Sequence, residues 1–228
     1  MPPRQLPLDL GHVVGLSRDD LVVSPANQQA TNVIDAWPEW PTPIVLLVGP
    51  AGSGKSHLAA IWREQAGAVQ MAAHDIADHV GGLGPTPVLI DDIGANGLDE
   101  TGLFHLINAV KGAGSSLLLV SRDFPMSWKI ALPDLASRMK TATLVEIHEP
   151  DDVLLSGVIT KLFADRQVEV DPHVVQFLVR RIERSLPTAI RVVERLDRLA
   201  LEQKSKITRS MASEAIEAID TGQTKLDM

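Results

Sequence analysis

The chain has 228 residues, of which 45% are hydrophobic and 22% charged, so it can bury one substantial core and a smaller second one. It contains no cysteine, which excludes a disulfide framework and a Cys-based zinc site. The formal net charge of -8 argues against a protein that holds nucleic acid through a broad basic face.

The N-terminal segment is expected to hold a tail rather than a membrane or secretion signal. Its first residues lack the apolar run of a secretory signal, and no apolar stretch of the chain approaches membrane-spanning length. Residues 1–43 are rich in proline, with one predicted helix at 26–37. We expect a cytoplasmic protein without membrane contact, with a tail over residues 1–20.

Five short apolar runs alternate with helical patterns from residue 44 onward. Continuous apolar runs of this length are typical of buried parallel strands, whose crossover helices cover both faces of the sheet. We therefore predict that residues 21–150 form an α/β domain with a five-stranded parallel sheet flanked by helices. The runs cover residues 44–48, 68–71, 88–90, 117–120 and 144–147.

The strand pattern stops after Pro150 and only helical patterns follow. A small all-helical domain over residues 151–228 is therefore predicted. Six arginines give it a cationic band, which is either a solvated face or a surface for an acidic partner or a DNA backbone. The predicted helices cover residues 151–166, 172–184, 187–204 and 209–220, and the band contains Arg180, Arg181, Arg184, Arg191, Arg195 and Arg198.

A phosphate-binding loop is indicated directly after the first run. Residues 49–56 match G-x-x-x-x-G-K-S between an apolar strand and a helix, which is the context this pattern requires. Glycines let the loop turn its N–H groups onto a phosphate, Lys55 would reach the β and γ oxygens, and Ser56 would bind Mg²⁺. The residues expected at the nucleotide are Gly49, Pro50, Ala51, Gly52, Ser53, Gly54, Lys55, Ser56 and His57.

Two carboxylates follow the third run. Asp91 and Asp92 would lie at the carboxyl edge of a strand, where ligands bind in open parallel sheets. Asp91 is suited to the Mg²⁺ shell, and Asp92 to orienting or activating an attacking water. Together with the loop, these residues predict a site for ATP or ADP with Mg²⁺.

The order of these motifs resembles the AAA+ P-loop module of the bacterial initiator DnaA, and within that family the short Hda-type regulators that inactivate DnaA. The resemblance covers nearly the whole chain. It implies an AAA+ domain followed by a helical lid, bound ADP and a homodimer. Asn27, in Ser-Pro-Ala-Asn ahead of a helix, resembles the family's nucleotide-base pocket.

Three further positions follow from the resemblance. The sensor residue of the family falls on Ser121 or on Arg122, because this chain has Arg122 before Asp123 where the family often has Asp-Arg. Arg138 resembles the arginine finger, whose planar charged fork suits a neighbouring subunit's γ-phosphate. Pro187 occupies the place of a second sensor arginine, and Arg191, one turn later, is the candidate substitute.

The first ten residues resemble the peptide by which Hda-type proteins dock on the DNA polymerase sliding clamp. An extended peptide can place its leading amide in a polar notch and its alternate apolar side chains in a groove. DnaA continues into a helix-turn-helix domain, whereas this sequence stops at Met228, so we expect DNA contact only through the clamp. The clamp-binding residues would be Gln5, Leu6, Leu8 and Leu10.

The sequence alone is compatible with three functions. The first is a nucleotide-bound adaptor that docks on the clamp and completes ATP hydrolysis by DnaA through Arg138, thereby inhibiting replication initiation. The second is an autonomous AAA+ ATPase, such as a DnaA paralogue or a helicase loader, driven by Lys55, Asp91 and Asp92. The third is a small-molecule kinase, which lacks evident lid arginines for a second phosphate substrate. Whether this chain hydrolyses ATP itself is open.

Overall fold

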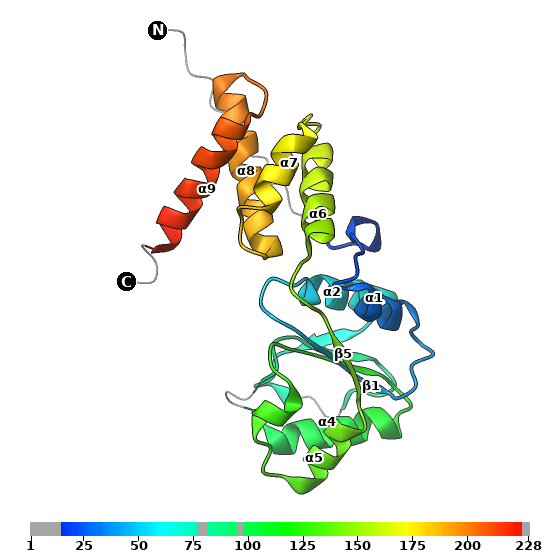
Figure 1. Cartoon of the computed structure of the whole chain (residues 1–228). Helices are drawn as coiled ribbons and strands as arrows, with labels where there is room; N and C mark the ends of the chain where they lie inside the picture. The colour runs from blue at the N-terminus through cyan, green and yellow to red at the C-terminus, as the bar shows by residue number, and fades with distance from the viewer. Residues whose placement is uncertain (1–14, 77–81, 95–97, 225–228) are drawn as a thin grey trace. The chain divides into compact units, whose positions relative to one another are not determined.

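The computed structural model describes residues 15–76, 82–94 and 98–224, with the side chains of residues 220–224 excepted. These residues form two compact units: Leu16–Glu149 is an α/β unit, and only helices follow from Pro150 onward (Figure 1). The proposed clamp-binding residues lie outside the described residues. They are Gln5, Leu6, Leu8 and Leu10.

The α/β unit is built on a parallel sheet in the order β2-β3-β4-β1-β5. This confirms the predicted fold class and all five predicted strands. Val48 of β1 pairs with Ser121 of β4, so the carboxyl ends of the two strands lie side by side. The strands are β1 (Ile44–Val48), β2 (Val69–Met71), β3 (Val88–Ile90), β4 (Leu117–Ser121) and β5 (Thr143–Glu146).

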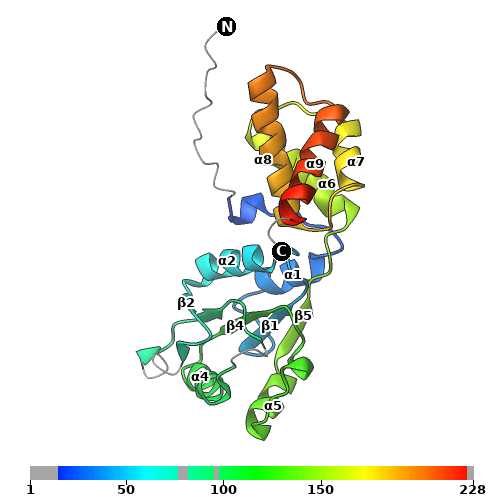
Figure 2. The same ribbon diagram turned by 90° about the vertical axis from the view of Figure 1, so that its left-hand side faces the viewer.

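Successive side chains of the central strand β1 enter two different cores, because they alternate across the sheet. One core lies between the sheet and α4 (Glu100–Gly112) with α5 (Pro133–Lys140), and includes Leu46. The other lies between the sheet and α1 (Gln28–Asp35) with α2 (Lys55–Ala66), and includes Leu47. Figure 2 shows these helix pairs on opposite faces of the sheet.

The proline-rich segment before β1 contributes to the core. The fully buried ring of Trp62, on α2, stacks on Trp40 at 5.2 Å and meets Trp37 edge-on at 6.4 Å. The Trp40 indole N–H donates to the carbonyl of Val33 at 2.7 Å, which fixes the segment against α1. Two residues that look like part of a proline-rich loop thus close one face of the sheet.

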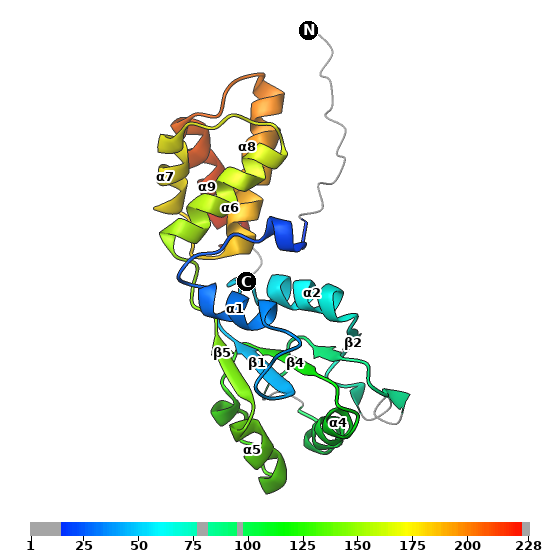
Figure 3. The same cartoon turned by 90° about the vertical axis from the view of Figure 1, so that its right-hand side faces the viewer.

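The helical unit packs four amphipathic helices around one core (Figure 3). Asp151 and Asp171 cap α6 and α7 by accepting the backbone N–H groups of Leu154 and His173. No helix among the described residues has the length and hydropathy that a bilayer crossing requires. The helices are α6 (Asp152–Asp165), α7 (Pro172–Val179), α8 (Leu186–Gln203) and α9 (Arg209–Thr224).

The predicted C-terminal end of α7 is wrong. α7 stops at Val179 instead of continuing to residue 184. Beyond it, the Arg184 guanidinium donates to Asp152 at 2.8 Å and to the carbonyl of Pro150 at 3.1 Å, so the chain is tied to the start of α6. Ser185, the residue directly before α8, is in extended conformation, which a continuous helix would not permit.

Candidate nucleotide-binding site

The loop between β1 and α2 requires glycine at three positions. Gly52 and Gly54 have φ values of 73° and 100°, in the left-handed region that favours glycine. At Gly49 a Cβ atom would lie 2.2 Å from the backbone oxygen of Ile147, so a side chain does not fit there. These requirements explain why the predicted loop carries its glycines at these places.

The loop presents backbone donors at the start of α2. The amides at a helix N-terminus carry partial positive charge and suit a phosphate. The Ser53 hydroxyl is buried and has no hydrogen-bond partner among the described residues, whereas the Ser56 side chain at the helix start is exposed. Within the described part of the chain, the backbone N–H groups without an acceptor include those of Gly52, Gly54, Lys55 and Ser56.

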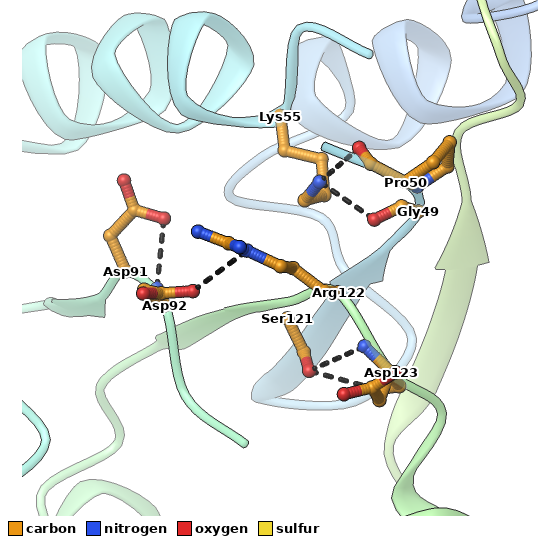
Figure 4. Close-up of polar contacts among 8 residues, drawn as sticks. All are labelled: Gly49, Pro50, Lys55, Asp91, Asp92, Ser121, Arg122 and Asp123. Atoms are coloured by element: carbon orange, nitrogen blue, oxygen red, sulfur yellow. Dashed lines mark hydrogen bonds and ion pairs between the residues drawn. The ribbon is translucent and has the colours of Figure 1, made fainter. Parts of the chain in front are cut away.

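The Lys55 side chain folds back over the loop. Its ammonium donates to the carbonyls of Gly49 and Pro50, each at 2.7 Å (Figure 4). Burial lowers the pKa of Lys55 below its usual value, and the Arg122 charge lowers it further, whereas the carboxylates of Asp91 and Asp92 raise it. The loop thus holds a buried cation that a phosphate would stabilise.

The two acids follow β3, and Arg122 extends toward them from the end of β4. Asp91 accepts the backbone N–H of Asp92 at 2.9 Å, and Asp92 has a left-handed φ of 60°. The Arg122 Nε lies 3.4 Å from an Asp92 carboxylate oxygen, and Figure 4 shows the guanidinium between the acids and Lys55. The structure therefore places Lys55, Asp91 and Asp92 at one edge of the sheet, together with Arg122, one of the two sensor candidates.

Ser121 is buried at the end of β4, and its hydroxyl serves the following turn. It donates to the carbonyl of Asp123 at 2.8 Å and accepts the Asp123 N–H at 3.1 Å. Its own carbonyl accepts the N–H of Gly49 at 3.3 Å, which ties β4 to the phosphate loop. Of the two sensor candidates, Arg122 is the one that points toward the acids (Figure 4).

Asn27 and His57 both make contacts within the α/β unit. The Asn27 side chain accepts the N–H of Ser24 at 2.8 Å and donates to the carbonyl of Val22 at 2.9 Å. His57 Nε2 lies 3.0 Å from the carbonyl of Ser17. Both side chains thus shape the segment ahead of α1, and their contact with a nucleotide stays a prediction.

Arg138 lies on α5 with its guanidinium over an aromatic ring of the neighbouring helix. Its Cζ atom is 5.0 Å from the centre of the Phe104 ring on α4. Its carbonyl accepts the hydroxyl of Thr141 at 2.8 Å. No carboxylate of the described residues pairs with the guanidinium, so its donors are available to an anion.

The two positions considered for a second sensor arginine, Pro187 and Arg191, lie near the start of α8. Pro187 is in the first turn, where its missing N–H has no cost. Arg191 is exposed one turn later and donates to the Thr188 hydroxyl at 3.1 Å, which in turn donates to Glu183 at 3.2 Å. The role of Arg191 at a nucleotide stays a prediction.

The residues present fit a nucleotide phosphate with Mg²⁺. Free amides, the unpartnered Ser53 hydroxyl and the Lys55 ammonium form a cradle for phosphate oxygens. Ser56 and Asp91 are oxygen ligands of the kind that Mg²⁺ prefers. Sheet order, loop and acids together define an AAA+ P-loop fold with a helical lid.

Comparisons with known proteins find a similar fold in other proteins. Residues 159–212 match the family model "Hda, lid domain". Domain III of the replication initiation protein DnaA of Thermotoga maritima has a TM-score of 0.74 at 17% identity, over 89% of this chain and 96% of that one. The Holliday junction branch migration motor RuvB of the same organism has a TM-score of 0.71 at 20% identity, over 90% and 72%.

An uncharacterized protein of Haemophilus influenzae is 26% identical over 180 residues, which cover 73% of this chain and 78% of that protein. Residues 159–212 are thus similar to an Hda lid domain, and the fold of the chain is similar to that of domain III of DnaA.

Replacing Arg122 with alanine should shift the pH dependence of ADP binding. Protonated Lys55 is the form that holds a phosphate, so affinity should fall as the pH rises through its lowered pKa. Without the Arg122 charge that pKa rises, and the fall should move to higher pH. Calorimetric titration with ADP from about pH 8 to about pH 10 measures the shift. Arg63→Ala, which removes a guanidinium bonded to Gln70, is the control, and coincident curves for the two variants would contradict the assignment.

Proposed function

We propose that this protein is a DnaA-related regulator of replication initiation, which holds a nucleotide and stimulates hydrolysis of the ATP bound to DnaA. The observation that carries the proposal is the Hda lid-domain match on an AAA+ fold. The intact phosphate loop supports bound ADP or ATP with Mg²⁺. In this role the protein inhibits re-initiation.

The geometry around Arg138 supports an arginine finger acting on a neighbouring molecule. The Phe104 ring holds the guanidinium from one side by cation–π attraction. Its donors carry no carboxylate partner among the described residues, so they can meet a γ-phosphate of DnaA. A fixed positive fork stabilises the charge that develops on phosphoryl oxygens during transfer to water.

The site of this chain is better arranged to hold a nucleotide than to turn it over. Asp92 is the carboxylate expected to orient an attacking water, and the Arg122 guanidinium lies 3.4 Å from it. Water must compete with this guanidinium for the same oxygens. A nucleotide-bound adaptor needs no turnover of its own, so the contact supports the adaptor role.

Docking on the sliding clamp is proposed through Gln5, Leu6, Leu8 and Leu10. Replacing Gln5 with alanine removes an amide whose partners in the clamp would be left unpaired, and we expect clamp affinity to fall about tenfold. Surface plasmon resonance on immobilised clamp measures this loss. Arg4→Gln, one residue earlier, is the control, and equal affinity of the two variants would refute the assignment.

Docking on the clamp would also bring this protein to DNA, although its net charge argues against a broad basic face. Clamp bound around DNA concentrates the protein near DnaA, so stimulation should depend on loaded clamp. We propose a homodimer from the resemblance to Hda-type proteins. Size-exclusion chromatography with light scattering tests the dimer.

An autonomous AAA+ ATPase is the second candidate. The complete loop with Lys55, Asp91 and Asp92 at one sheet edge favours it. Steady ATP turnover by this chain without partners would support the ATPase and weaken the adaptor proposal.

A further inference from the structure

A cavity of about 580 Å³ lies on the helical unit, outside the nucleotide site. It is formed by α7, the turn after it and the start of α9. Helix α7 packs on α9 (Figure 3). Its volume falls within the roughly 300–1,000 Å³ of small-molecule sites. We call it the Phe177 pocket; the residues that matter here are Asp171, Phe177, Arg180, Arg181 and Arg209.

Two arginines from different elements converge on one aromatic ring in the Phe177 pocket. The guanidinium carbons of Arg181 and Arg209 lie 5.1 Å and 4.6 Å from the centre of the half-buried Phe177 ring. Cation–π attraction orients both groups. Like charges held near one ring repel each other, and an anion between them would remove that repulsion.

The pocket carries uncompensated positive charge. Among the described residues its lining holds one carboxylate, that of Asp171, which accepts the N–H of His173 as the cap of α7. None of the three guanidiniums pairs with a carboxylate in the part of the chain that the structure describes. Two other arginines of this unit do form ion pairs: Arg184 with Asp152, and Arg166 with Glu194 and Asp197.

We propose that the Phe177 pocket binds a phosphate monoester, on a free nucleotide or at the 5′ end of a DNA strand. Three guanidiniums against one carboxylate leave an excess of two positive charges. A phosphate monoester carries about -1.5 to -2 at neutral pH, whereas a carboxylate or a phosphodiester carries one negative charge. Planar guanidinium forks match phosphate oxygens in pairs, so charge and geometry select the same ligand.

The test uses the full chain saturated with ADP, so that the loop at Lys55 is occupied. NMR signals of the Phe177 ring and of the Arg181 and Arg209 Nε–H groups report on the pocket alone. Inorganic phosphate should shift these signals. Titrations with AMP and with an oligonucleotide that carries a 5′ phosphate distinguish the two sources of the ligand. The compound with the higher affinity for the pocket identifies the source.

Arg209→Gln should weaken phosphate binding about tenfold, because it removes charged donors. Arg195→Gln, at an exposed position on α8 that does not line the pocket, is the matched control and should bind phosphate as the wild type does. Thermal unfolding of both variants verifies the fold. Equal phosphate affinity of the two variants would overturn the proposal. Acetate or a glutamate-rich peptide that shifts the signals as phosphate does would also overturn it, whereas equal binding of 5′-hydroxyl and 5′-phosphate oligonucleotides would leave the free nucleotide as the source of the ligand.

Discussion

Replacing Arg138 with alanine should abolish the ability of this protein to stimulate hydrolysis of the ATP bound to DnaA. An arginine supplied by a partner accelerates such hydrolysis by about 10³–10⁵-fold in P-loop proteins, so one residue would carry most of the effect. The guanidinium is held over the Phe104 ring and leaves its donors to an anion. Release of inorganic phosphate from DnaA-bound ATP, with clamp loaded on DNA, measures the loss.

Two control variants separate the role of Arg138 from a loss of structure. Lys140→Ala removes an exposed cation from the same last turn of α5 and should keep full stimulation. Arg138→Lys keeps the charge but loses the planar fork, so it should remain strongly impaired. Stimulation by Arg138→Ala equal to that by Lys140→Ala would show that Arg138 is not the finger.

Methionine at Lys55 should weaken ADP binding about 100-fold, because charge-assisted hydrogen bonds to the phosphates are lost. The ammonium donates to the carbonyls of Gly49 and Pro50, so it already stands over the phosphate loop. Fluorescence titration with a labelled ADP measures the affinity.

Lys111→Met is the matched control for this substitution. Lys111 is an exposed lysine in the last turn of α4, and its replacement should leave the affinity unchanged. Both variants should keep the melting temperature of the wild type in the absence of nucleotide. An unchanged affinity in Lys55→Met would place nucleotide binding elsewhere.

Features that depend on a short stretch of sequence could be predicted. The strands were identified because each is a short apolar run, and the phosphate loop because its glycines and Lys55 are contiguous and lie between a strand and a helix. α5 was not predicted as a helix, although Pro133 suits its first turn. The end of α7 was missed because the contact of Arg184 with Asp152 joins distant residues.

The arrangement of the site depends on strand order, which local patterns do not contain. Arg122 meets Asp92 because β4 lies beside β3 in the sheet. Arg138 reaches Phe104 because α4 and α5 pack on the same face. The position of Arg122 directly after a buried strand, at the same edge as the acids, was the only sequence signal for its contact with Asp92.

The rate of ATP hydrolysis by DnaA, with and without this protein, ADP and clamp loaded on DNA, tests the proposed adaptor role most directly. We expect stimulation only when the protein, its nucleotide and the loaded clamp are all present, with negligible ATP turnover by the protein alone. Unchanged hydrolysis by DnaA, together with steady turnover by the isolated protein, would contradict the adaptor role and establish an autonomous ATPase.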